Sequence, residues 1–469
     1  MTKKKNGLLS AALIYIIGSF FTQGLRFLTL PIFSRIMPTD DFGYLASYET
    51  WVAIIMVVIG LQTTSSIANA YIDYGEKNIE DYVYSISYIG SITALITTIV
   101  LSIFASGFTR LFEVTKFSLY LGIVQCLFTF FFTALITEYR MLNKPWKYLF
   151  FTVGNSVVTL SLAIVFVLWL PSDKYIGRVY GLTIAAFIFG LIAIVIVFLR
   201  TKTKKPQFDH IKYALKLSVP LIFHAFAAIV LSRCDQIMLL KLTTASDAGI
   251  YSYGTNFAHI IYVLYTACNQ AYLPWYYKKL NQKQEKEILA VNRLYIFLFS
   301  IGFIAFIFIL PEIIKIMSAK EYYGAMYSAP IVSFGFYLNY LYNFPVNYEF
   351  FHKKTHFIAL GTILSAGINI ALNALLIPIL GAIGAAFATA GSYLILLIAH
   401  VFVAKKIIKN YSMPIRYFTI TFLAVSAMIS LYYVTINLLI IRLIVFIVCG
   451  VSALLLIMKN KNKIKEIGL

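Results

Sequence analysis

Hydrophobic runs of about 20 residues, each long enough to cross about 30 Å of hydrocarbon, recur along the whole chain and alternate with short polar segments. Reading these runs and the Gly, Pro and Asn residues that interrupt them predicts fourteen membrane-spanning helices. The segment 323–347 has the weakest pattern, because three asparagines and a proline interrupt it. The predicted limits are 8–33, 43–68, 83–106, 117–139, 148–170, 176–199, 213–240, 248–273, 291–310, 323–347, 356–378, 381–403, 415–435 and 437–458.

Two of these stretches are related to each other. Residues 8–43 and 214–249 each contain a long hydrophobic helix with a cation inside it, followed by a short polar turn and a second helix. A gapless alignment pairs Asp41 with Asp247, Gly43 with Gly249, and Trp51 with Phe257. Arg26 then falls one position from Arg233. The chain therefore reads as two related helical bundles that face each other across a wet cavity.

This repeat predicts how the chain is divided. We expect an N-lobe at 1–205 with helices 1–6, and a C-lobe at 206–410 with helices 7–12. The remaining segment, 411–469, holds two further helices and a basic tail that have no counterpart in the repeat. The prediction is an all-α polytopic membrane protein of two pseudo-symmetric six-helix lobes plus two C-terminal helices.

Composition and charge support this interpretation. Only 12% of the 469 residues are charged, about half the proportion found in soluble domains. If the N-terminus is cytoplasmic, 28 of the 39 Lys and Arg residues fall on the cytoplasmic side and 9 on the outer side. This predicts that both termini are cytoplasmic, and that the basic N-terminus precedes an uncleaved first span rather than a signal peptide. The net charge of +20 therefore indicates membrane anchoring, not nucleic-acid binding.

The sequence shows no pattern typical of an enzyme or a metal protein. Cys126, Cys234, Cys268 and Cys449 all lie in hydrophobic runs without metal-ligand spacing. GxxxxGK[ST], HExxH and GxSxG motifs are absent, and no loop is long enough for a soluble catalytic domain. We expect neither enzymatic activity nor a cofactor or metal, and no ATP hydrolysis by this chain itself.

Arg26 is the first candidate for binding chemistry. A charge at membrane depth costs at least about 2.5 kcal/mol and usually faces a protein interior or a wet cavity. Gln23 lies three residues earlier, on the same helix face. A guanidinium beside an amide suits a phosphate or pyrophosphate group. The alternative is an arginine that pairs with a carboxylate only for assembly.

The seventh predicted helix carries His224, Arg233 and Asp235. At about 100° per residue, His224 and Asp235 share a face and Arg233 lies nearly opposite. Arg233 is the second candidate for the cavity, as the counterpart of Arg26. Asp235 could bind a coupling cation or proton, or form a salt bridge to another helix. His224 is either a proton site or a hydrogen-bonded buried histidine.

Two acidic residues could pair with these arginines. Glu49 follows the first turn of the second helix, and Glu138 lies near the end of the fourth. Glu49 is the better candidate partner for Arg26, since its repeat counterpart is the neutral Thr255. Solvation at the membrane interface is the alternative for both.

The eleventh predicted helix carries a polar stripe at i, i+4 and i+8, formed by Ser365, Asn369 and Asn373. The stripe suits hydrogen bonding between helices, or the lining of the cavity. The twelfth, GAIGAAFATAGSY (381–393), has small residues every four positions, which is typical of close helix packing.

Two segments resemble a known family. The pattern INIALNALLIP (368–378) with GAIGAAFATAGSY, and the N-terminal FFTQGLRFLTLPIFSRIMPTDDFGYL (20–45), are similar to bacterial Wzx-type polysaccharide flippases of the multidrug/oligosaccharidyl-lipid/polysaccharide exporter superfamily. The similarity extends over essentially the whole chain. It implies alternating access around a cationic cavity, with Arg26 and Arg233 as its cations. Other site residues do not transfer safely, because sequences in this family diverge with substrate.

The function implied by this resemblance is transport of a lipid-linked sugar. An undecaprenyl-pyrophosphate oligosaccharide would move from the cytoplasmic to the outer leaflet of the bacterial inner membrane, for O-antigen, lipopolysaccharide or capsule synthesis. Membrane lipids are expected partners, and H⁺ or Na⁺ coupling and polymerase machinery are open. Two rivals are a cation-coupled multidrug antiporter, which the membrane-depth arginines disfavour, and a membrane polymerase, which the short loops disfavour.

Overall fold

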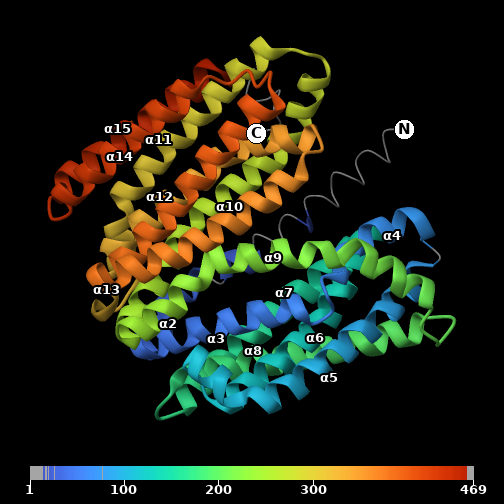
Figure 1. Ribbon diagram of the computed structural model, residues 1–469. Coiled ribbons are helices and arrows are strands. Elements are labelled where there is room, and N and C mark those ends of the chain that lie inside the picture. The colour runs from blue at the N-terminus through green and yellow to red at the C-terminus, as the bar shows by residue number, and fades with distance from the viewer. Residues whose placement is uncertain (1–13, 16–17, 19–20, 26, 77, 462–469) are drawn as a thin grey trace. The chain divides into compact units, whose positions relative to one another are not determined.

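The computed structural model describes residues 14–15, 18, 21–25, 27–76 and 78–461, and these form helices connected by short turns, without a β-strand (Figure 1). The contacts divide the chain into two compact units, 1–249 and 250–469. The boundary falls within one helix, α10. The lobes predicted from the repeat, at 1–205 and 206–410, are a different division from this one, which rests on contacts. They therefore stay a prediction.

The described part of the first unit contains eight α-helices and the start of α10. Its helices are α2 (Leu30–Ile36), α3 (Thr39–Val58), α4 (Ile67–Tyr74), α5 (Ile79–Phe112), α6 (Lys116–Met141), α7 (Pro145–Trp169), α8 (Lys174–Arg200) and α9 (Phe208–Leu242), with the 3₁₀ turn η1 (Thr63–Ser66) before α4. Here α3, α6 and α8 lie side by side, and α9 packs on α3 and α5 (Figure 1). The helix that opens the second repeat thus packs against helices of the first.

The second unit contains most of α10 (Ala245–Asn281) and the rest of the chain. Its other elements are α11 (Glu285–Met317), η2 (Lys320–Tyr322), α12 (Ala325–Phe351), α13 (Thr355–Phe402), the π-helix η3 (Val403–Ile408), α14 (Ile415–Thr435) and α15 (Leu439–Lys459). Within this unit α12 packs on α13, while α14 and α15 pack on α11. The two C-terminal helices predicted from the sequence therefore attach through α11.

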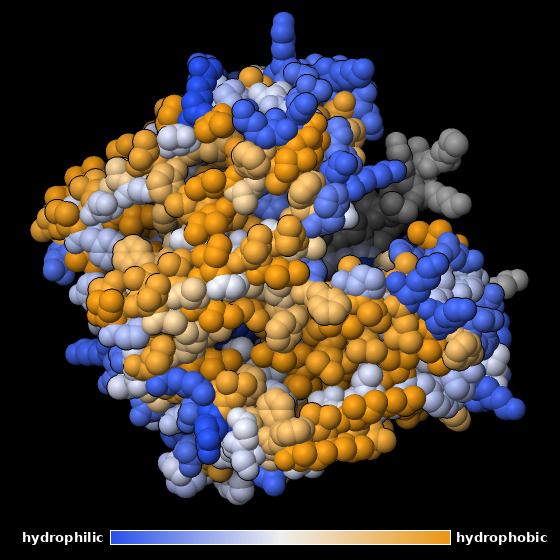
Figure 2. Space-filling model, in the orientation of Figure 1, coloured by the Kyte–Doolittle hydropathy of each residue, from blue (hydrophilic) through white to orange (hydrophobic). Residues whose placement is uncertain are grey.

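The predicted spans are found as helices. Among the described residues, nine helices are long and hydrophobic enough to cross a membrane, or ten when the bent pair of α3 and the segment Thr63–Tyr74 counts as one. The exposed surface is correspondingly hydrophobic over much of the face in Figure 2, and hydrophilic residues gather at its margins. The first predicted span, 8–33, lies largely outside the described residues.

In two segments the continuity of the helix differs from the pattern in the sequence. The helix predicted over 43–68 is broken after Val58 and bends by 54°, because Gly60, Leu61 and Gln62 all have positive φ. A side chain at Gly60 would also overlap the ring of Phe130. Conversely, the weakly predicted segment 323–347 is one uninterrupted helix, α12, despite Pro330 and Pro345.

The helices predicted over 356–378 and 381–403 are the two halves of α13. Gly381 separates them with φ +56° and ψ −132°, a conformation that is essentially restricted to glycine. A side chain at Gly384 would overlap the backbone of Leu376 and Ile377. The small residue therefore lets the returning half lie directly against the first.

A glycine contact joins the two repeats. A Cβ atom on Gly43 of α3 would overlap the carbonyl of Ala245, and one on Gly249 of α10 would overlap the carbonyl of Thr39. The sequence alignment pairs these same residues, so each repeat presents the same atoms to the other. The Thr39 hydroxyl adds a 2.7 Å hydrogen bond to the Ser246 hydroxyl. The starts of α3 and α10 thus meet as pseudo-symmetric partners.

We expect Gly249→Ala to destabilise the protein by about 1 to 3 kcal/mol, as overpacked cores are. The added methyl group can be accommodated only if the α3–α10 contact opens. The midpoint of thermal unfolding in detergent measures this effect. Gly107→Ala is the matched control, because a side chain at Gly107 meets no atom within 4 Å. Equal midpoints for both variants would contradict the close contact.

A second contact fixes the C-terminal helices. Arg442 is the buried residue of α15, with 1% of its side chain exposed, and its Nη2 donates to Glu312 Oε1 of α11 at 2.8 Å. Arg442 Nη1 also contacts Glu312 Oε2. The rest of α15 is largely exposed. This bidentate ion pair is therefore a main contact that attaches α15 to α11.

The anchor predicts an order of stability. Glu312→Gln leaves a buried cation without its carboxylate and should cost about 3 kcal/mol, the lower end of the range for buried pairs, since Glu312 is partly exposed. The double variant Glu312→Gln/Arg442→Met should be more stable than Glu312→Gln alone. Thermal unfolding midpoints test this order, with Lys459→Gln, at an exposed position at the end of α15, as the control. A double variant less stable than the single one would refute it.

Candidate functional site

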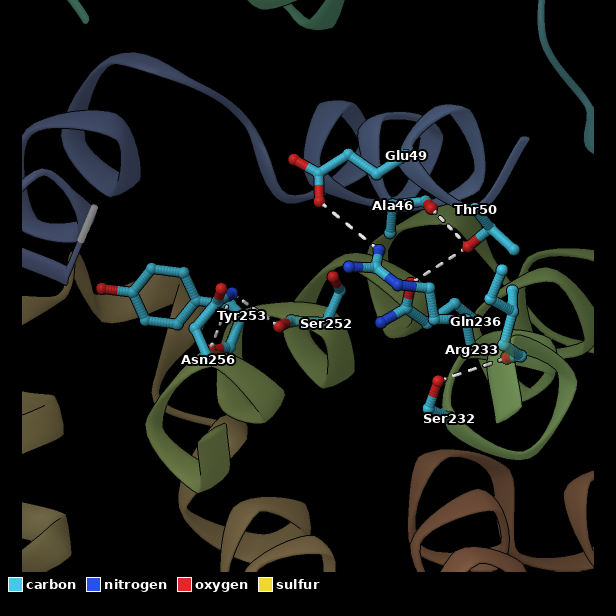
Figure 3. Close-up of polar contacts among 10 residues, drawn as sticks. Ala46, Glu49, Thr50, Ser232, Arg233, Gln236, Ser252, Tyr253 and Asn256 are labelled. Atoms are coloured by element: carbon cyan, nitrogen blue, oxygen red, sulfur yellow. Dashed lines mark hydrogen bonds and ion pairs between the residues drawn. The ribbon is translucent and has the colours of Figure 1, made fainter. Parts of the chain in front are cut away.

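The candidate site lies where α9 packs on α3. Arg233 of α9 and Glu49 of α3 face each other, with Arg233 Nη1 3.7 Å from Glu49 Oε2 (Figure 3). The side chains are 29% and 26% exposed. At 3.7 Å the two groups attract each other without a short hydrogen bond. The guanidinium therefore keeps donors that can turn toward another anion.

Polar neighbours extend the site along the same contact. The Thr50 hydroxyl lies 2.8 Å from the Ala46 carbonyl and 3.3 Å from the Gln236 Oε1 atom (Figure 3). Thr50 and Gln236 are both buried. They hold α3 and α9 in register, so that Glu49 and Arg233 meet on the more open edge of the contact.

The depth of Arg233 follows from helix geometry. Nine residues separate it from Leu242 at the end of α9, which corresponds to about 14 Å along the axis. If α9 leaves the hydrocarbon at Leu242, the guanidinium lies near the middle of a layer about 30 Å thick. A cation at this depth without a role would be costly, so the partly open ion pair is the strongest candidate for a functional group in the first unit.

The other predicted site residues are distributed differently. Asp235 is buried on α9, and its Oδ1 accepts the backbone N–H of Gln236 at 2.8 Å. His224 and Gln23 are exposed. Arg26 lies outside the described residues, so its proposed partnership with Glu49 stays a prediction. The structure thus brings Glu49 to Arg233, while Asp235 turns into the packed side of the helix.

Asp41, which the repeat alignment singled out, has a structural role. Its Oδ1 accepts the backbone N–H of Tyr175 in the first turn of α8, at 3.2 Å. The neighbouring Lys174 Nζ donates to the Ile36 carbonyl at 2.9 Å. The repeat counterpart Asp247 instead accepts the hydroxyl of Thr244 at 2.8 Å. The aspartate therefore lies in the first turn of a helix in both repeats, but only in the first repeat does it also bind a neighbouring helix.

Glu138 belongs to a separate cluster at the other end of the unit. It is buried, and its Oε1 lies 2.7 Å from Arg200 Nη2, which also contacts Glu80. A pocket of about 430 Å³ borders this cluster, lined by Tyr139, Trp146, Lys147, Phe150, Phe151, Ile196 and Arg200. A second pocket of about 580 Å³ is lined by Tyr44, Ser106, Thr109, Arg110, Glu113, Val114, Thr115, Asp173 and Tyr175. Neither is lined by Arg233 or Glu49.

In the second unit the polar stripe faces protein. Ser365, Asn369 and Asn373 are all buried, and Asn373 Nδ2 donates to Asn369 Oδ1 at 3.0 Å. Asn369 Nδ2 and Asn373 Oδ1 have no hydrogen-bond partner. The stripe therefore forms part of the interior of this unit, and it retains spare polar capacity.

Two of the ionic pairs that sequence reasoning missed lie in the second unit. Arg442 lies within α15 and pairs with Glu312. Glu349 of α12 and His400 of α13 form a completely buried pair. The sequence does mark Glu349 and His400 as candidates, because each is an isolated ionisable residue in a hydrophobic run. It does not show that they pair with each other, since 51 residues separate them.

Comparison with known proteins gives a consistent result. The family model described as "Polysaccharide biosynthesis protein" matches residues 8–280, more than half of the chain. Among curated proteins, the "Lsg locus putative protein 1" of Haemophilus influenzae is 24% identical over 370 residues, covering 77% of this chain and 89% of that protein. An uncharacterized membrane protein of the same organism is also 24% identical, over 363 residues, with 75% and 86% covered.

Solved structures show the same fold. A lipid II flippase, MurJ, in an inward closed conformation superposes with a TM-score of 0.71 at 16% identity, covering 97% of this chain and 100% of that one. An inward-facing multidrug resistance transporter of the MATE family and the MOP superfamily superposes with a TM-score of 0.65 at 12% identity, covering 90% and 99%. At these identities the likeness concerns the fold.

The geometry of the site predicts how its variants behave. Glu49→Gln and Arg233→Gln should each change stability by roughly 1 kcal/mol or less, because both side chains are partly exposed and the ion pair is long. Thermal unfolding midpoints close to wild type would confirm this. The buried Glu138→Gln, measured in parallel, should lower the midpoint clearly. A large loss for Glu49→Gln would instead make this pair a structural anchor.

Proposed function

The chain belongs to the polysaccharide biosynthesis protein family, and we propose that it is a flippase for undecaprenyl-pyrophosphate-linked oligosaccharide repeat units. It moves them from the cytoplasmic to the outer leaflet of the bacterial cytoplasmic membrane, for surface polysaccharides such as O-antigen or capsule. The observation that carries the proposal is Arg233, a half-buried cation near the middle of the membrane whose pairing with Glu49 is loose. Family membership and the flippase-like fold support it.

The chemistry of the substrate fits this site. A pyrophosphate offers several anionic oxygens, and a guanidinium can bind two of them at once. Arg233 is held near its place by Glu49, and a pyrophosphate that carries more charge can displace that single carboxylate. Arg26 and Gln23 contribute in the same way from the first repeat. The prenyl tail stays in lipid, so only the headgroup needs a polar path.

The transport cycle in this proposal is alternating access between the two repeats. The lobes 1–205 and 206–410 expose the headgroup site to one side of the membrane and then the other. Because the chain has no nucleotide-binding motif, an ion gradient supplies the energy. Asp235, buried on α9 two residues after Arg233, is the candidate in that helix for a coupling cation or proton, and His224 is a second one. The two C-terminal helices lie outside this repeat.

A multidrug antiporter is the alternative that the structure favours next. The fold is also that of a MATE-family multidrug transporter. Cationic drugs require an acidic site, however, and the partly exposed Arg233 opposes such a charge. A membrane-embedded polymerase would need a catalytic centre, and the loops of the described chain are too short to hold one.

The proposal predicts that Arg26→Glu/Arg233→Glu abolishes export. In the source organism with its own gene replaced, outer-leaflet lipid-linked sugar and surface polymer should fall by at least about tenfold, since the anion then meets two carboxylates. Arg233→Lys should retain part of the activity, because lysine keeps the charge but not the two-pronged geometry.

Lys241→Glu is the matched control, since it reverses an exposed charge at the end of the same helix. Membrane abundance of each variant is measured by immunoblot. Normal polymer output from the double arginine variant would remove this site from the mechanism. Drug resistance on overexpression, without any change in polymer, would favour the antiporter instead.

A further inference from the structure

A buried acid–imidazole pair lies inside the second unit. Glu349 stands near the end of α12, and His400 near the end of α13. Glu349 Oε1 and His400 Nδ1 are 2.8 Å apart, and the two side chains are 0% and 1% exposed. Both groups can take up a proton, and each is held in a place that water does not reach.

Local sequence features bring the pair together. The turn at Gly381 returns the second half of α13 alongside the first, which carries His400 back toward the end of α12. A Cβ atom on Gly361 would overlap His400 Nε2, so this glycine makes room for the imidazole. Directly after His400 the helix changes to the π-helix Val403–Ile408. Single π-turns inside helices are frequent at functional sites.

The pair does not satisfy all of its own polar atoms. Among the described residues, Glu349 Oε2 and His400 Nε2 are both buried without a hydrogen-bond partner. Buried polar atoms are usually bonded, and each of these two atoms is a position that can carry a proton. The pair therefore has an unused proton-accepting atom on both of its partners, in addition to the contact between them.

Counting protons shows what that change is. With one hydrogen between Nδ1 and Oε1 and none on Nε2, the pair carries one negative charge. Adding one proton makes it neutral overall, either as carboxylate with imidazolium or as carboxylic acid with imidazole. An uncompensated buried charge is costly, so release of this proton requires that the surroundings of the pair change. Proton occupancy and conformation are therefore linked.

Several other titratable groups surround the pair. Tyr342 of α12 lies edge-on to the His400 ring at 5.0 Å between centroids. His356, in the first turn of α13, and Tyr411, in the segment after the π-helix, also act electrostatically on Glu349. Lys353 and Lys354 follow α12 and are exposed. By the charge distribution this end of α12 is the cytoplasmic one.

We propose that Glu349 and His400 form a proton-binding site, which takes up or releases one proton at its predicted cytoplasmic end as the transporter changes conformation. The coupling part of this inference rests on the proposed transport function, whereas proton binding itself does not. The reaction is a simple protonation: a proton from water joins the pair, and no other bond forms or breaks.

Infrared spectroscopy of the full-length protein in lipid nanodiscs tests proton binding. The difference between acidic and alkaline buffers should contain the band of a buried protonated carboxyl group where the added proton lies on Glu349, or of a buried imidazolium where it lies on His400. Glu349→Gln should remove this band, and His400→Gln should remove it or shift the pH at which it appears. Glu349→Asp retains a carboxyl group and should restore a band, which keeps the test valid if Glu349→Gln folds poorly.

Matched controls come from exposed residues of the same kind. Glu285→Gln and His352→Gln, both at exposed positions, should leave the band unchanged. If the wild-type band is the same in Glu349→Gln, or if His400→Gln does not alter its pH dependence, the pair is not the proton site and the inference fails.

Polymer export in cells tests the coupling. Glu349→Gln should lower surface polymer by a factor of roughly 5 to 150, the usual range for coupling between two sites. Residual export should no longer respond to a proton uncoupler. Wild-type export with Glu349→Gln, despite loss of the infrared band, would refute coupling. If the wild-type gene itself supports no export while the band titrates, the proposed function fails and the proton site stands.

Discussion

The cost of a charge in hydrocarbon governs which helices of this protein are tied together. In the described part of the chain, ionisable side chains within or at the ends of the helices meet partners on other helices: Arg233 with Glu49, Arg200 with Glu138, Arg442 with Glu312, and His400 with Glu349. Each pair joins two helices that hydrophobic packing alone would leave free to slide, because lipid tails are as hydrophobic as the helix surfaces. The pairs therefore specify contacts as well as neutralise charge.

Differences among these pairs separate anchoring from function. Arg442 is enclosed and bound through two nitrogens, which is the arrangement expected of a fixed attachment. Arg233 and Glu49 stay partly exposed and 3.7 Å apart. Glu349 and His400 are enclosed like Arg442, but both of these groups can take up a proton. An enclosed, permanently charged arginine suits a fixed attachment, an open pair suits the exchange of partners that we propose, and an enclosed pair of titratable groups suits the exchange of a proton.

Much of the fold follows from the sequence because a membrane imposes a simple length rule. Hydrophobic runs predict where the helices lie, although α10 extends to Asn281 instead of ending at 273. The repeat alignment also pairs Gly43 with Gly249, which both lie in the close contact of α3 and α10. What the rule cannot give is the opposing helix. Periodicity shows which residues share a face, but not that Glu49 lies against Arg233, or that Glu349 meets a histidine 51 residues away. The break after Val58 is equally hidden, because it depends on Phe130 filling the space beside Gly60.

The repeats also show how a symmetric scaffold can acquire different chemistry on its two sides. The contact of Gly43 and Gly249 is made with equivalent atoms from each repeat, since both need backbone to approach backbone. Side chains near it have diverged: Asp41 anchors α8 while Asp247 binds only its own turn, and Glu49 corresponds to the neutral Thr255. The acid of the first repeat, Glu49, faces the cation of the second, Arg233, so the side chains that differ between the repeats meet across their contact.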